Sequence, residues 1–371
     1  MRRRRSDPRR AVPPAGVAAA QRERTASGVA YGTWLTRGKD GRLTLYAPTD
    51  GGLLAWAEVT AGGPEWSEPR FVAAVGLTDL TVTQGADTYV HLLGRRQRTG
   101  ADGAQTVDIV HAIQYQTGLA VTEWRSLGNP HQDRGQGLAV GVPVGAVAED
   151  GTVHVFVRGA QGGLMLRREA PNGKWRAWED LRGAGVEAPP AAVALGGGRI
   201  EVCAAAQTGV LVWRQLQPGG DFTGPRGFSL RPEPGTIVAL ETGPDRSTFF
   251  WSDTVVGGGA AWRAGGWPIA LGGSASERSY AAVRTSLDGY DCVVLAHRDR
   301  AGSAVLGVGG TENEDNGFWW YDLAEPCRGV PALALDGRGR VVMALIAPDG
   351  VPKVARQEDS AGLTLTRWQR L

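Results

Sequence analysis

Cysteine is nearly absent from the 371-residue chain. Its three cysteines, Cys203, Cys292 and Cys327, lie far apart and form no C-x-x-C pair. This number and spacing encode neither a disulfide framework nor a zinc site. Lysine is equally scarce, so that arginine supplies nearly all of the 40 basic residues. Such a bias is typical of GC-rich coding and suggests an actinobacterium-like bacterial source.

Long apolar runs are also missing. No run approaches the ~20 residues that cross a bilayer, so we expect a soluble protein without a membrane span. The stretch Ala11–Ala20 follows a basic start, but Pro13 and Pro14 interrupt it, which does not match the apolar core of a secretory signal. We therefore expect a cytoplasmic location, with release by a non-classical or particle-borne route as the alternative.

Positive charge is concentrated in the first 27 residues. They hold eight arginines against Asp7 and Glu23, so this segment carries about +6 of a chain whose formal net charge is +2. Blocks of like charge are usually solvated, so residues 1–27 are predicted to form an arginine-rich flexible arm. Nucleic acid is not an expected partner, because the remaining body is acidic and would repel it.

Glycine is abundant, with 55 residues, and 21 prolines accompany it without a collagen period. Frequent tight turns of this kind favour β-structure. A sustained 3.6-residue apolar period with helix caps is almost absent, which excludes a helical architecture.

A W-x-x-L motif repeats through the chain. Copies in phase begin at Trp124, Trp178, Trp320 and Trp368. Degenerate copies fill two slots between Trp178 and Trp320, at Phe222–Phe228 and Trp267–Leu271, and a third, Trp66–Phe71, precedes Trp124. The repeat therefore has seven units of roughly 49 residues, a period typical of propellers.

Turn signals divide each unit into four strands. In residues 146–181, Asp150-Gly151, Gln161-Gly162-Gly163 and Asn172-Gly173 separate short apolar segments, including the alternating strand Thr152–Arg158. We predict an all-β, seven-bladed β-propeller over residues 28–371, with four antiparallel strands per blade. The expected blades are 28–74, 75–133, 138–186, 188–231, 234–272, 276–326 and 329–371. Because Val29–Thr36 is expected to be the first strand of its own blade, the ring should close without an exchanged strand.

The best unit has a recognisable pattern. It reads D-G-x-strand at Asp150–Arg158, G-x-L-x-x-R from Gly162, and G-x-W-x-x-W-x-x-L at Gly173–Leu181. This pattern resembles the repeat of the Photorhabdus luminescens lectin family, to which tectonin-type propellers are related. The resemblance implies noncatalytic sugar binding in pockets between blades, and similar propellers serve as targeting subunits of toxin particles. The first tryptophan of the motif survives at Trp66 and Trp175 but becomes Val121 and Leu365 in other units.

Tryptophan suits sugar recognition, because it offers an apolar ring face and one N–H donor. The repeating Trp124, Trp178, Trp320 and Trp368 are predicted to pack neighbouring blades together. The remaining candidates are predicted to bind a ligand, and they are Trp66, Trp175 with Arg176, and the non-repeating Trp56, Trp213, Trp251, Trp262 and Trp319.

The other polar residues give weaker indications of a functional site. The five histidines do not cluster in the sequence and are expected to be structural, so neither a metal nor another cofactor is predicted. The acidic segment Thr311–Gly317 lacks EF-hand spacing and is expected to be a solvated surface loop. No serine-hydrolase, zinc-protease or P-loop motif occurs. The leading hypothesis is therefore a lectin-like propeller with a glycan or small-sugar ligand. The alternatives are a scaffold that binds a protein partner or a particle, and a propeller enzyme with dispersed carboxylates.

Overall fold

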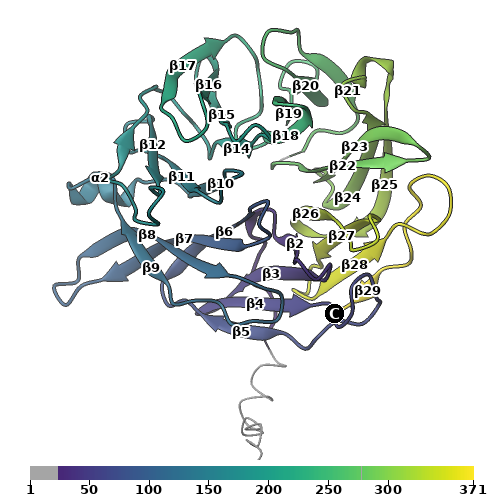
Figure 1. Ribbon diagram of the computed structural model, residues 1–371, viewed down its shortest axis with the longest axis horizontal. Helices are drawn as coiled ribbons and strands as arrows, with labels where there is room; N and C mark the ends of the chain where they lie inside the picture. Colours follow the sequence, from purple (N-terminus) through teal and green to yellow (C-terminus); the bar gives the residue numbers. More distant parts are fainter. Residues whose placement is uncertain (1–23, 277) are drawn as a thin grey trace, which may run out of the picture.

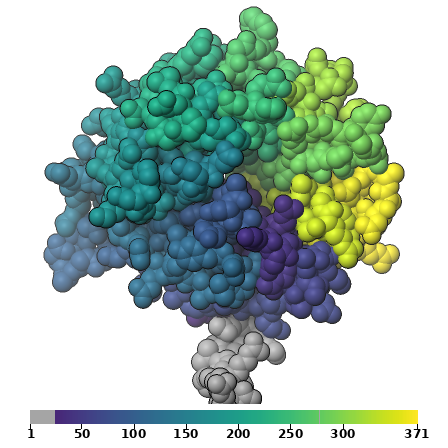
Figure 2. All heavy atoms as spheres, in the orientation of Figure 1, coloured from purple at the N-terminus to yellow at the C-terminus, as the bar shows by residue number. Residues whose placement is uncertain are grey.

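The computed structural model describes residues 24–276 and 278–371. In these residues, seven β-sheets surround one central axis, each built from consecutive antiparallel strands (Figure 1). The predicted all-β seven-bladed propeller is confirmed. Figure 2 shows the same face in space-filling form, with a hollow near the middle beside the purple residues that begin the described chain.

The strands of each blade follow one another along the chain. Blade 1 comprises β2 (Leu35–Arg37), β3 (Leu43–Thr49), β4 (Gly52–Ala57) and β5 (Arg70–Ala73), and blade 2 comprises β6 (Leu77–Gln84), β7 (Val90–Thr99), β8 (Gln105–Gln114) and β9 (Arg125–Gly128). Blade 3 comprises β10 (Val144–Val147), β11 (Val153–Arg158), β12 (Leu164–Arg168) and β13 (Glu179–Asp180), and blade 4 comprises β14 (Ala191–Ala194), β15 (Ile200–Ala206), β16 (Gly209–Gln215) and β17 (Phe222–Phe228). Blade 5 comprises β18 (Val238–Gly243), β19 (Arg246–Ser252), β20 (Gly259–Trp262) and β21 (Ile269–Gly272). Blade 6 comprises β22 (Ala281–Leu287), β23 (Tyr290–Arg298), β24 (Ser303–Gly310) and β25 (Phe318–Pro326). Blade 7 comprises β26 (Arg328–Leu335), β27 (Val341–Ile346), β28 (Pro352–Arg356) and β29 (Gln369–Arg370).

Each predicted unit contains one sheet, except that β26 starts one residue early, at Arg328. The polar stretch Arg95–Gln105 of the second unit does not interrupt its blade. It lengthens β7 and β8 to ten residues each, and they pair along their whole length.

The second and third strands of the blades form the core. All residues of β15 and β27 are buried, and so are five of the six residues of β11. The segment Thr152–Arg158, predicted as an alternating strand, has a pattern that is typical of a half-buried strand. Both faces are buried instead, because a blade packs against a neighbour on each side.

A recurrent side-chain cap fixes the start of the second strand. The carboxylate of Glu58, at the end of the third strand of blade 1, accepts a hydrogen bond from the Leu43 backbone N–H, 2.8 Å away. In blade 4, Gln215 accepts from the Ile200 N–H at 3.0 Å, and in blade 7, Gln357 accepts from the Val341 N–H at 3.1 Å. A side-chain oxygen thus satisfies a backbone donor where the hairpin leaves it unpaired.

The tryptophans of the W-x-x-L motif join neighbouring blades, as predicted. The indole N–H of Trp178 in blade 3 donates to the Leu127 carbonyl of blade 2 at 3.0 Å, and Trp320 in blade 6 donates to the Leu271 carbonyl of blade 5 at 2.9 Å. Trp124 and Trp368 pack into the apolar clusters that include residues of blades 1 and 6, respectively.

The first and last blades each consist of their own four strands, which confirms closure without an exchanged strand. The predicted strand Val29–Thr36 is divided, however. Its first part, β1 (Tyr31–Gly32), pairs in parallel with β6 of blade 2, and only its end contributes to β2. The predicted arm spans residues 1–27, of which residues 1–23 lie outside the part of the chain that the structure describes. From Arg24 onward the chain lies across the junction between blades 7 and 1, where the Ala26 N–H donates to the Gly350 carbonyl at 2.9 Å.

Helical structure is sparse in the described part of the chain. It consists of α2 (Arg134–Leu138), which is capped by the Asp133 carboxylate, and the 3-10 turn η1 (Glu314–Asn316). Neither of these is long or apolar enough to cross a membrane.

Candidate functional site

Three predicted ligand residues belong to the core. Trp213, Trp251 and Trp262 expose at most 2% of their surface. Their indole N–H groups are bonded inside the protein, to the Leu181 carbonyl, the Asp253 carboxylate and the Gly266 carbonyl, respectively. Their ring faces are therefore not available to a ligand in this structure.

Trp56, Trp213 and Trp262 also share one position in the repeat, although the sequence suggests that they do not repeat. Each lies on the third strand of its blade and pairs with the second strand, opposite Leu45, Val202 and Phe249, respectively. Each packs in an apolar cluster with its own blade's strands and a neighbouring blade. The position is thus used mainly to join blades.

Trp175 and Arg176 lie at the position in blade 3 that Trp66 and Ser67 occupy in blade 1. Trp66 forms a β-bridge with Glu58, and Trp175 forms the matching bridge with Glu169. The Trp175 ring contacts His111 of blade 2 edge-on, with ring centroids 5.4 Å apart, while Arg176 is exposed. Neither residue lines any of the three cavities described below.

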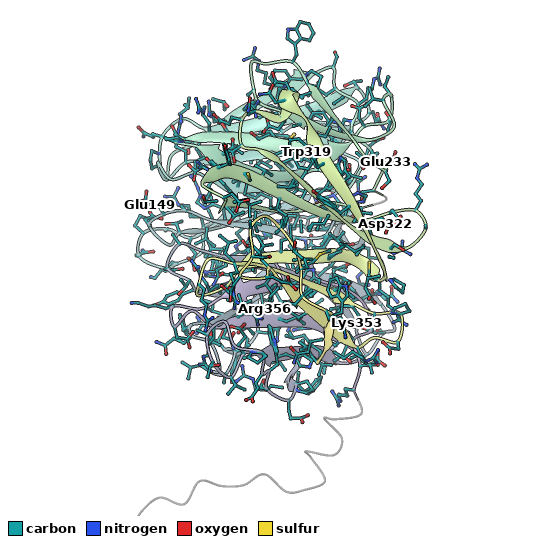
Figure 3. All side chains as sticks on the ribbon, turned by 90° about the vertical axis from the view of Figure 1, so that its right-hand side faces the viewer. Glu149, Glu233, Trp319, Asp322, Lys353 and Arg356 are labelled. Carbon is teal, nitrogen blue, oxygen red and sulfur yellow. The ribbon has the colours of Figure 1, made fainter. Side chains whose placement is uncertain are left out.

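Trp319 lies at the rim of the propeller. It is 59% exposed on the edge strand β25, and Tyr321, two residues later on the same face of this strand, is 51% exposed. Figure 3 shows Trp319 and Asp322 along this strand, above Lys353 of the last blade. Trp319 is accessible but not enclosed by other groups.

Trp56 and Trp66 are brought together in a cavity between the last blade and the first. This closure cavity has a volume of about 280 Å³. Blade 1 contributes the two tryptophans and the segment 67–69, blade 7 contributes Pro352 and β29, and the described chain begins at its edge. Its lining residues are Arg24, Thr25, Trp56, Trp66, Ser67, Glu68, Pro69, Gly350, Val351, Pro352, Gln369, Arg370 and Leu371.

Trp66 has an unused donor in this wall. Its indole nitrogen is buried and has no hydrogen-bond partner among the described residues. The ring is held in place by the apolar cluster of blades 1, 2 and 7, and the Arg356 guanidinium lies 6.0 Å from its centroid. Buried N–H groups usually have a partner, so this one suggests that a ligand or a water accepts from it.

Other polar groups around the closure cavity have defined positions. The Ser67 hydroxyl accepts from the Ala57 N–H at 3.1 Å and donates to the Glu68 carbonyl. The Arg370 guanidinium pairs with Asp349 at 2.6 Å, and the Arg24 guanidinium lies 3.7 Å from the centroid of the Phe71 ring. The cavity therefore combines flat apolar surface with amide, hydroxyl and charged groups.

Two further cavities open between blades. One, of about 610 Å³, is lined by blades 1 and 2 and includes Trp124, whose indole nitrogen also lacks a partner among the described residues. The other, of about 540 Å³, lies between blades 6 and 7 and contains three arginines. Among the lining residues of all three cavities, Glu68 has the only acidic side chain. None of the three therefore presents the pair of acids that glycoside hydrolysis requires.

The histidines are used inside the structure. His91 on β7 and His111 on β8 of blade 2 are in contact, with their ring nitrogens 3.0 Å apart, and His154 and His297 are fully buried. His131 is partly buried, and its Nε2 accepts from the Ala160 N–H at 3.1 Å. The described residues contain no group of histidines, cysteines and acids arranged to hold a metal ion.

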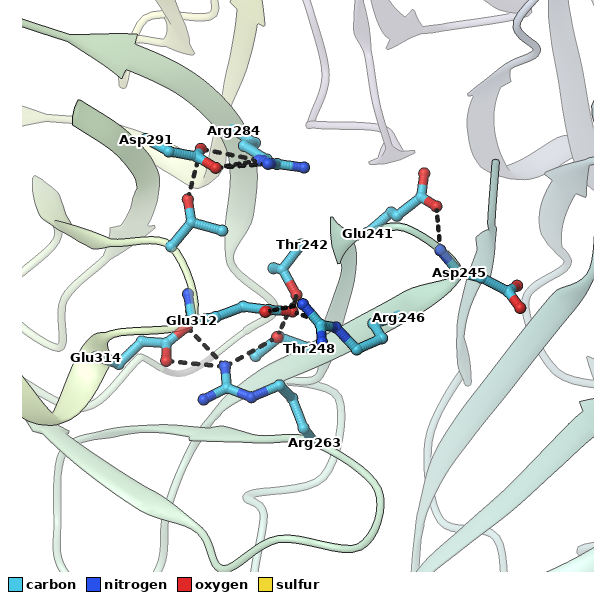
Figure 4. Close-up of polar contacts among 11 residues, drawn as sticks. Glu241, Thr242, Asp245, Arg246, Thr248, Arg263, Arg284, Asp291, Glu312 and Glu314 are labelled. Carbon is cyan, nitrogen blue, oxygen red and sulfur yellow. Dashed lines mark hydrogen bonds and ion pairs between the residues drawn. The ribbon is translucent and has the colours of Figure 1, made fainter. Parts of the chain in front are cut away.

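The expectation that Thr311–Gly317 is a solvated loop is wrong for its two glutamates, whereas Asn313, Asp315 and Asn316 are exposed. The Glu314 side chain is fully buried and pairs with Arg263 of blade 5 at 2.8 Å, and Glu312 accepts from Arg246 of blade 5 at 3.0 Å (Figure 4). The carboxylates are thus neutralised by arginines of the neighbouring blade, and the loop joins blades 5 and 6.

Several residues of the closure cavity have no signal in the sequence. Gln369 and Arg370 belong to a strand of two residues, and Arg24 lies in the predicted flexible arm. Gln369 and Arg370 meet Trp66 only because the ring closes, which brings together segments some 300 positions apart in the sequence.

Comparison with known proteins supports the fold. No protein-family model matches the chain, and no curated protein does. Among solved structures, a polysaccharide lyase of family PL25, an ulvan lyase bound to -[GlcA(1-4)Rha3S]-, has a TM-score of 0.52 at 12% identity and covers 92% of this chain and 93% of its own. The Aleuria aurantia lectin in complex with Fucalpha1-6GlcNAc has a TM-score of 0.50 at 13% identity, with coverages of 78% and 94%. The Hadza microbial sialidase Hz136 has a TM-score of 0.51 at 13% identity, with coverages of 81% and 70%.

At these identities the likeness establishes the propeller fold, which lectins, a sialidase and a lyase share. It does not select one activity, because one fold supports many functions. The resemblance to the Photorhabdus luminescens lectin family stays a prediction from the repeat.

Proposed function

We propose that this chain is a noncatalytic, lectin-like protein that binds a sugar residue in the closure cavity. The observation that carries the proposal is the buried indole N–H of Trp66 in the wall of that cavity, which has no hydrogen-bond partner in residues 24–276 and 278–371. A sugar hydroxyl is an acceptor of the right chemistry for this donor, and desolvation makes such a bond worth forming.

The composition of the cavity fits a carbohydrate. Tryptophan faces, Pro69 and Pro352 supply apolar surface for the C–H side of a sugar ring, while Ser67 and Gln369 supply hydrogen-bonding groups. Its volume of about 280 Å³ lies near the lower end of the range for small-molecule sites, which suits a single sugar residue rather than a long chain. The lectin and the ulvan lyase with this fold are both carbohydrate-associated proteins, which adds support.

The test is a glycan array on the full chain, followed by calorimetry with the best sugar. Trp66→Phe keeps an aromatic ring in the core but removes the N–H donor. We expect a loss of affinity of about tenfold, the equivalent of one hydrogen bond. Trp175→Phe, at the same repeat position in blade 3, is the matched control and should bind as the wild type does.

Equal binding by Trp66→Phe and the wild type would place the sugar elsewhere. Absence of any sugar binding at millimolar concentration by the folded chain would contradict the lectin proposal altogether. Two hypotheses would then remain: a propeller enzyme with dispersed carboxylates, and an interaction scaffold, for which the exposed Trp319 and Tyr321 of β25 are candidate contact residues.

A further inference from the structure

The indole N–H of Trp66 is covered, although its residue lines the closure cavity. The nitrogen atom is buried and has no hydrogen-bond partner in residues 24–276 and 278–371. A hydrogen bond from this N–H requires an acceptor about 2.9 Å from the nitrogen. A sugar hydroxyl therefore reaches the donor only after part of the cavity wall has moved.

One part of this wall differs from the rest in its structure. Arg24 and Thr25 line the cavity and belong to the irregular segment 24–27, which we call the strap. The other lining residues belong to blades 1 and 7, whose strands are paired in antiparallel ladders. Irregular surface segments open at a lower free energy than paired strands do. The strap is thus the part of the wall that moves at the lowest cost.

Hydrogen bonds attach the strap to both blades that flank the cavity. The Ala26 N–H donates to the Gly350 carbonyl of blade 7, and the Ser27 N–H donates to a carbonyl of blade 1, both at 2.9 Å. The Thr49 hydroxyl of blade 1 donates to the Thr25 carbonyl at 2.8 Å. Of the four strap residues, Ala26 is buried and the other three are exposed. The strap is therefore held mainly by polar contacts at the surface, which water can replace.

The first residue of the strap lies against the apolar group that contains Trp66. The Arg24 guanidinium is 3.7 Å from the centroid of the Phe71 ring, and Phe71 and Trp66 pack on the same apolar cluster. Contacts between a cation and an aromatic ring are weak at exposed sites. This contact positions the strap beside Trp66 without fixing it there.

We propose that the strap gates the closure cavity: attached, it covers the Trp66 N–H, and a sugar reaches this donor by displacing it. The inference rests on the proposed function, because it takes this N–H as the donor to a sugar hydroxyl. The apparent affinity is then reduced by the fraction of molecules in which the strap is released. A change that loosens the strap without altering the sugar contacts should therefore strengthen binding.

Exchange of the Trp66 indole proton with water tests the gate without any ligand. Its NMR signal is identified by its absence from Trp66→Phe. The Trp178 indole, which donates to the Leu127 carbonyl at 3.0 Å, is the reference and is identified in the same way. Thr49→Val removes the hydroxyl that holds the strap. We expect exchange at Trp66 to become about threefold to tenfold faster, the equivalent of one hydrogen bond, and exchange at Trp178 to stay unchanged.

Two glycine variants of blade 7 provide a stronger change and its matched control. Both positions have a positive φ, but a Cβ atom at Gly350 would lie 2.6 Å from the Ala26 carbonyl oxygen, whereas Gly339 has an open surrounding. Exchange at Trp66 should be at least tenfold faster in Gly350→Ala than in Gly339→Ala. Equal rates in these two variants would overturn the proposal. Parallel acceleration at Trp178 would also overturn it, because the variants would then act through unfolding of the whole chain.

Sugar binding separates the gate from the proposed function. Calorimetry on the full chain uses fucose, galactose, glucose and N-acetylglucosamine as probes. Any of these that binds should bind Thr49→Val more tightly than the wild type, by the same factor as the exchange rate rises. Equal affinity would overturn the gate and leave the sugar site in place. Faster exchange in Thr49→Val without binding of any sugar would support the gate and contradict the lectin proposal.

Discussion

At the scale of single residues, the buried histidines make the structure sensitive to acid. Burial lowers the pKa of His154 from 6.5 to about 4. Burial also lowers the pKa of both members of the His91 and His111 pair, and for His111 the positive charges of His91 and Arg125 lower it further. The folded chain therefore holds these rings neutral at pH values where the unfolded chain protonates them.

The consequence is a loss of stability as the pH falls. Below the unfolded pKa of about 6.5, unfolding takes up protons, so the free energy of unfolding decreases by up to about 1.4 kcal/mol per pH unit for each histidine. The decrease levels off near pH 4 for His91 and His154 and near pH 3 for His111, where the folded rings themselves become protonated. Denaturant unfolding at pH 7, 6 and 5 measures this slope above the range in which most carboxylates titrate. His154→Asn should reduce the slope whatever its effect on stability at pH 7, and an unchanged slope would contradict the assignment.

Single residues also set the limit of prediction from sequence. The blade-joining role of Trp178 and Trp320 was predictable, because residues that recur once per repeat occupy equivalent places. The burial of Glu314 was not, because its partner Arg263 lies some 50 positions earlier, in another blade. A charged side chain far from its partner in sequence is indistinguishable from a solvated one.

At the scale of elements, the segment from Arg24 to β1 holds the first and last blades together on one face. Its Ala26 N–H donates to the Gly350 carbonyl of blade 7, and its Ser27 N–H donates to the Pro48 carbonyl of blade 1, both at 2.9 Å. It then continues to β1, which pairs with blade 2. A short irregular segment thus provides what an exchanged strand provides in other propellers.

Two glycines of blade 7 test this contact. Gly350 has a φ of +83°, and a Cβ atom there would lie 2.6 Å from the Ala26 carbonyl oxygen, whereas Gly339 has a φ of +80° and an open surrounding. Alanine at either position costs about 1–2 kcal/mol of backbone strain. Gly350→Ala should lose at least about 1 kcal/mol more than Gly339→Ala, because it also displaces residue 26. Equal losses in guanidinium unfolding would show that the contact contributes nothing.

The hairpins were predictable from the sequence, because Asp-Gly and Asn-Gly turns mark them locally, as at Asp150-Gly151. The parallel pairing of Tyr31 and Gly32 with β6 was not, because these residues carry no turn signal or period and gain their place only from the neighbouring blades. The closure cavity was predictable only in part for the same reason: Trp66 occupies a recurring position of the repeat, whereas Arg370 occupies a variable position of the W-x-x-L motif and Arg24 precedes the first unit.

At the scale of the whole molecule, the junction of blades 7 and 1 is held at two separate places. One is the N-terminal segment. The other is a buried ion-pair network, in which Arg356 of blade 7 pairs with Glu58 of blade 1 and contacts Asp336 at 3.4 Å. Arg340 extends the network by donating to the Gly62 carbonyl of blade 1 at 2.8 Å. Apolar residues of blades 7 and 1 also belong to one continuous cluster at this junction.

Because either attachment can hold the junction closed, their losses should be coupled. Glu58→Gln removes one of the two carboxylates that Arg356 contacts, and the loss of a buried ion-pair partner costs up to about 3–5 kcal/mol. Combined with Gly350→Ala, the loss should exceed the sum of the single losses by at least about 0.5 kcal/mol, since only the double variant frees the whole junction. Combining Gly350→Ala with Glu314→Gln, which acts at the junction of blades 5 and 6, should give additive losses instead. Unfolding free energies for these five variants and the wild type decide the matter: if both pairs are additive, each attachment acts locally and the ring does not couple them.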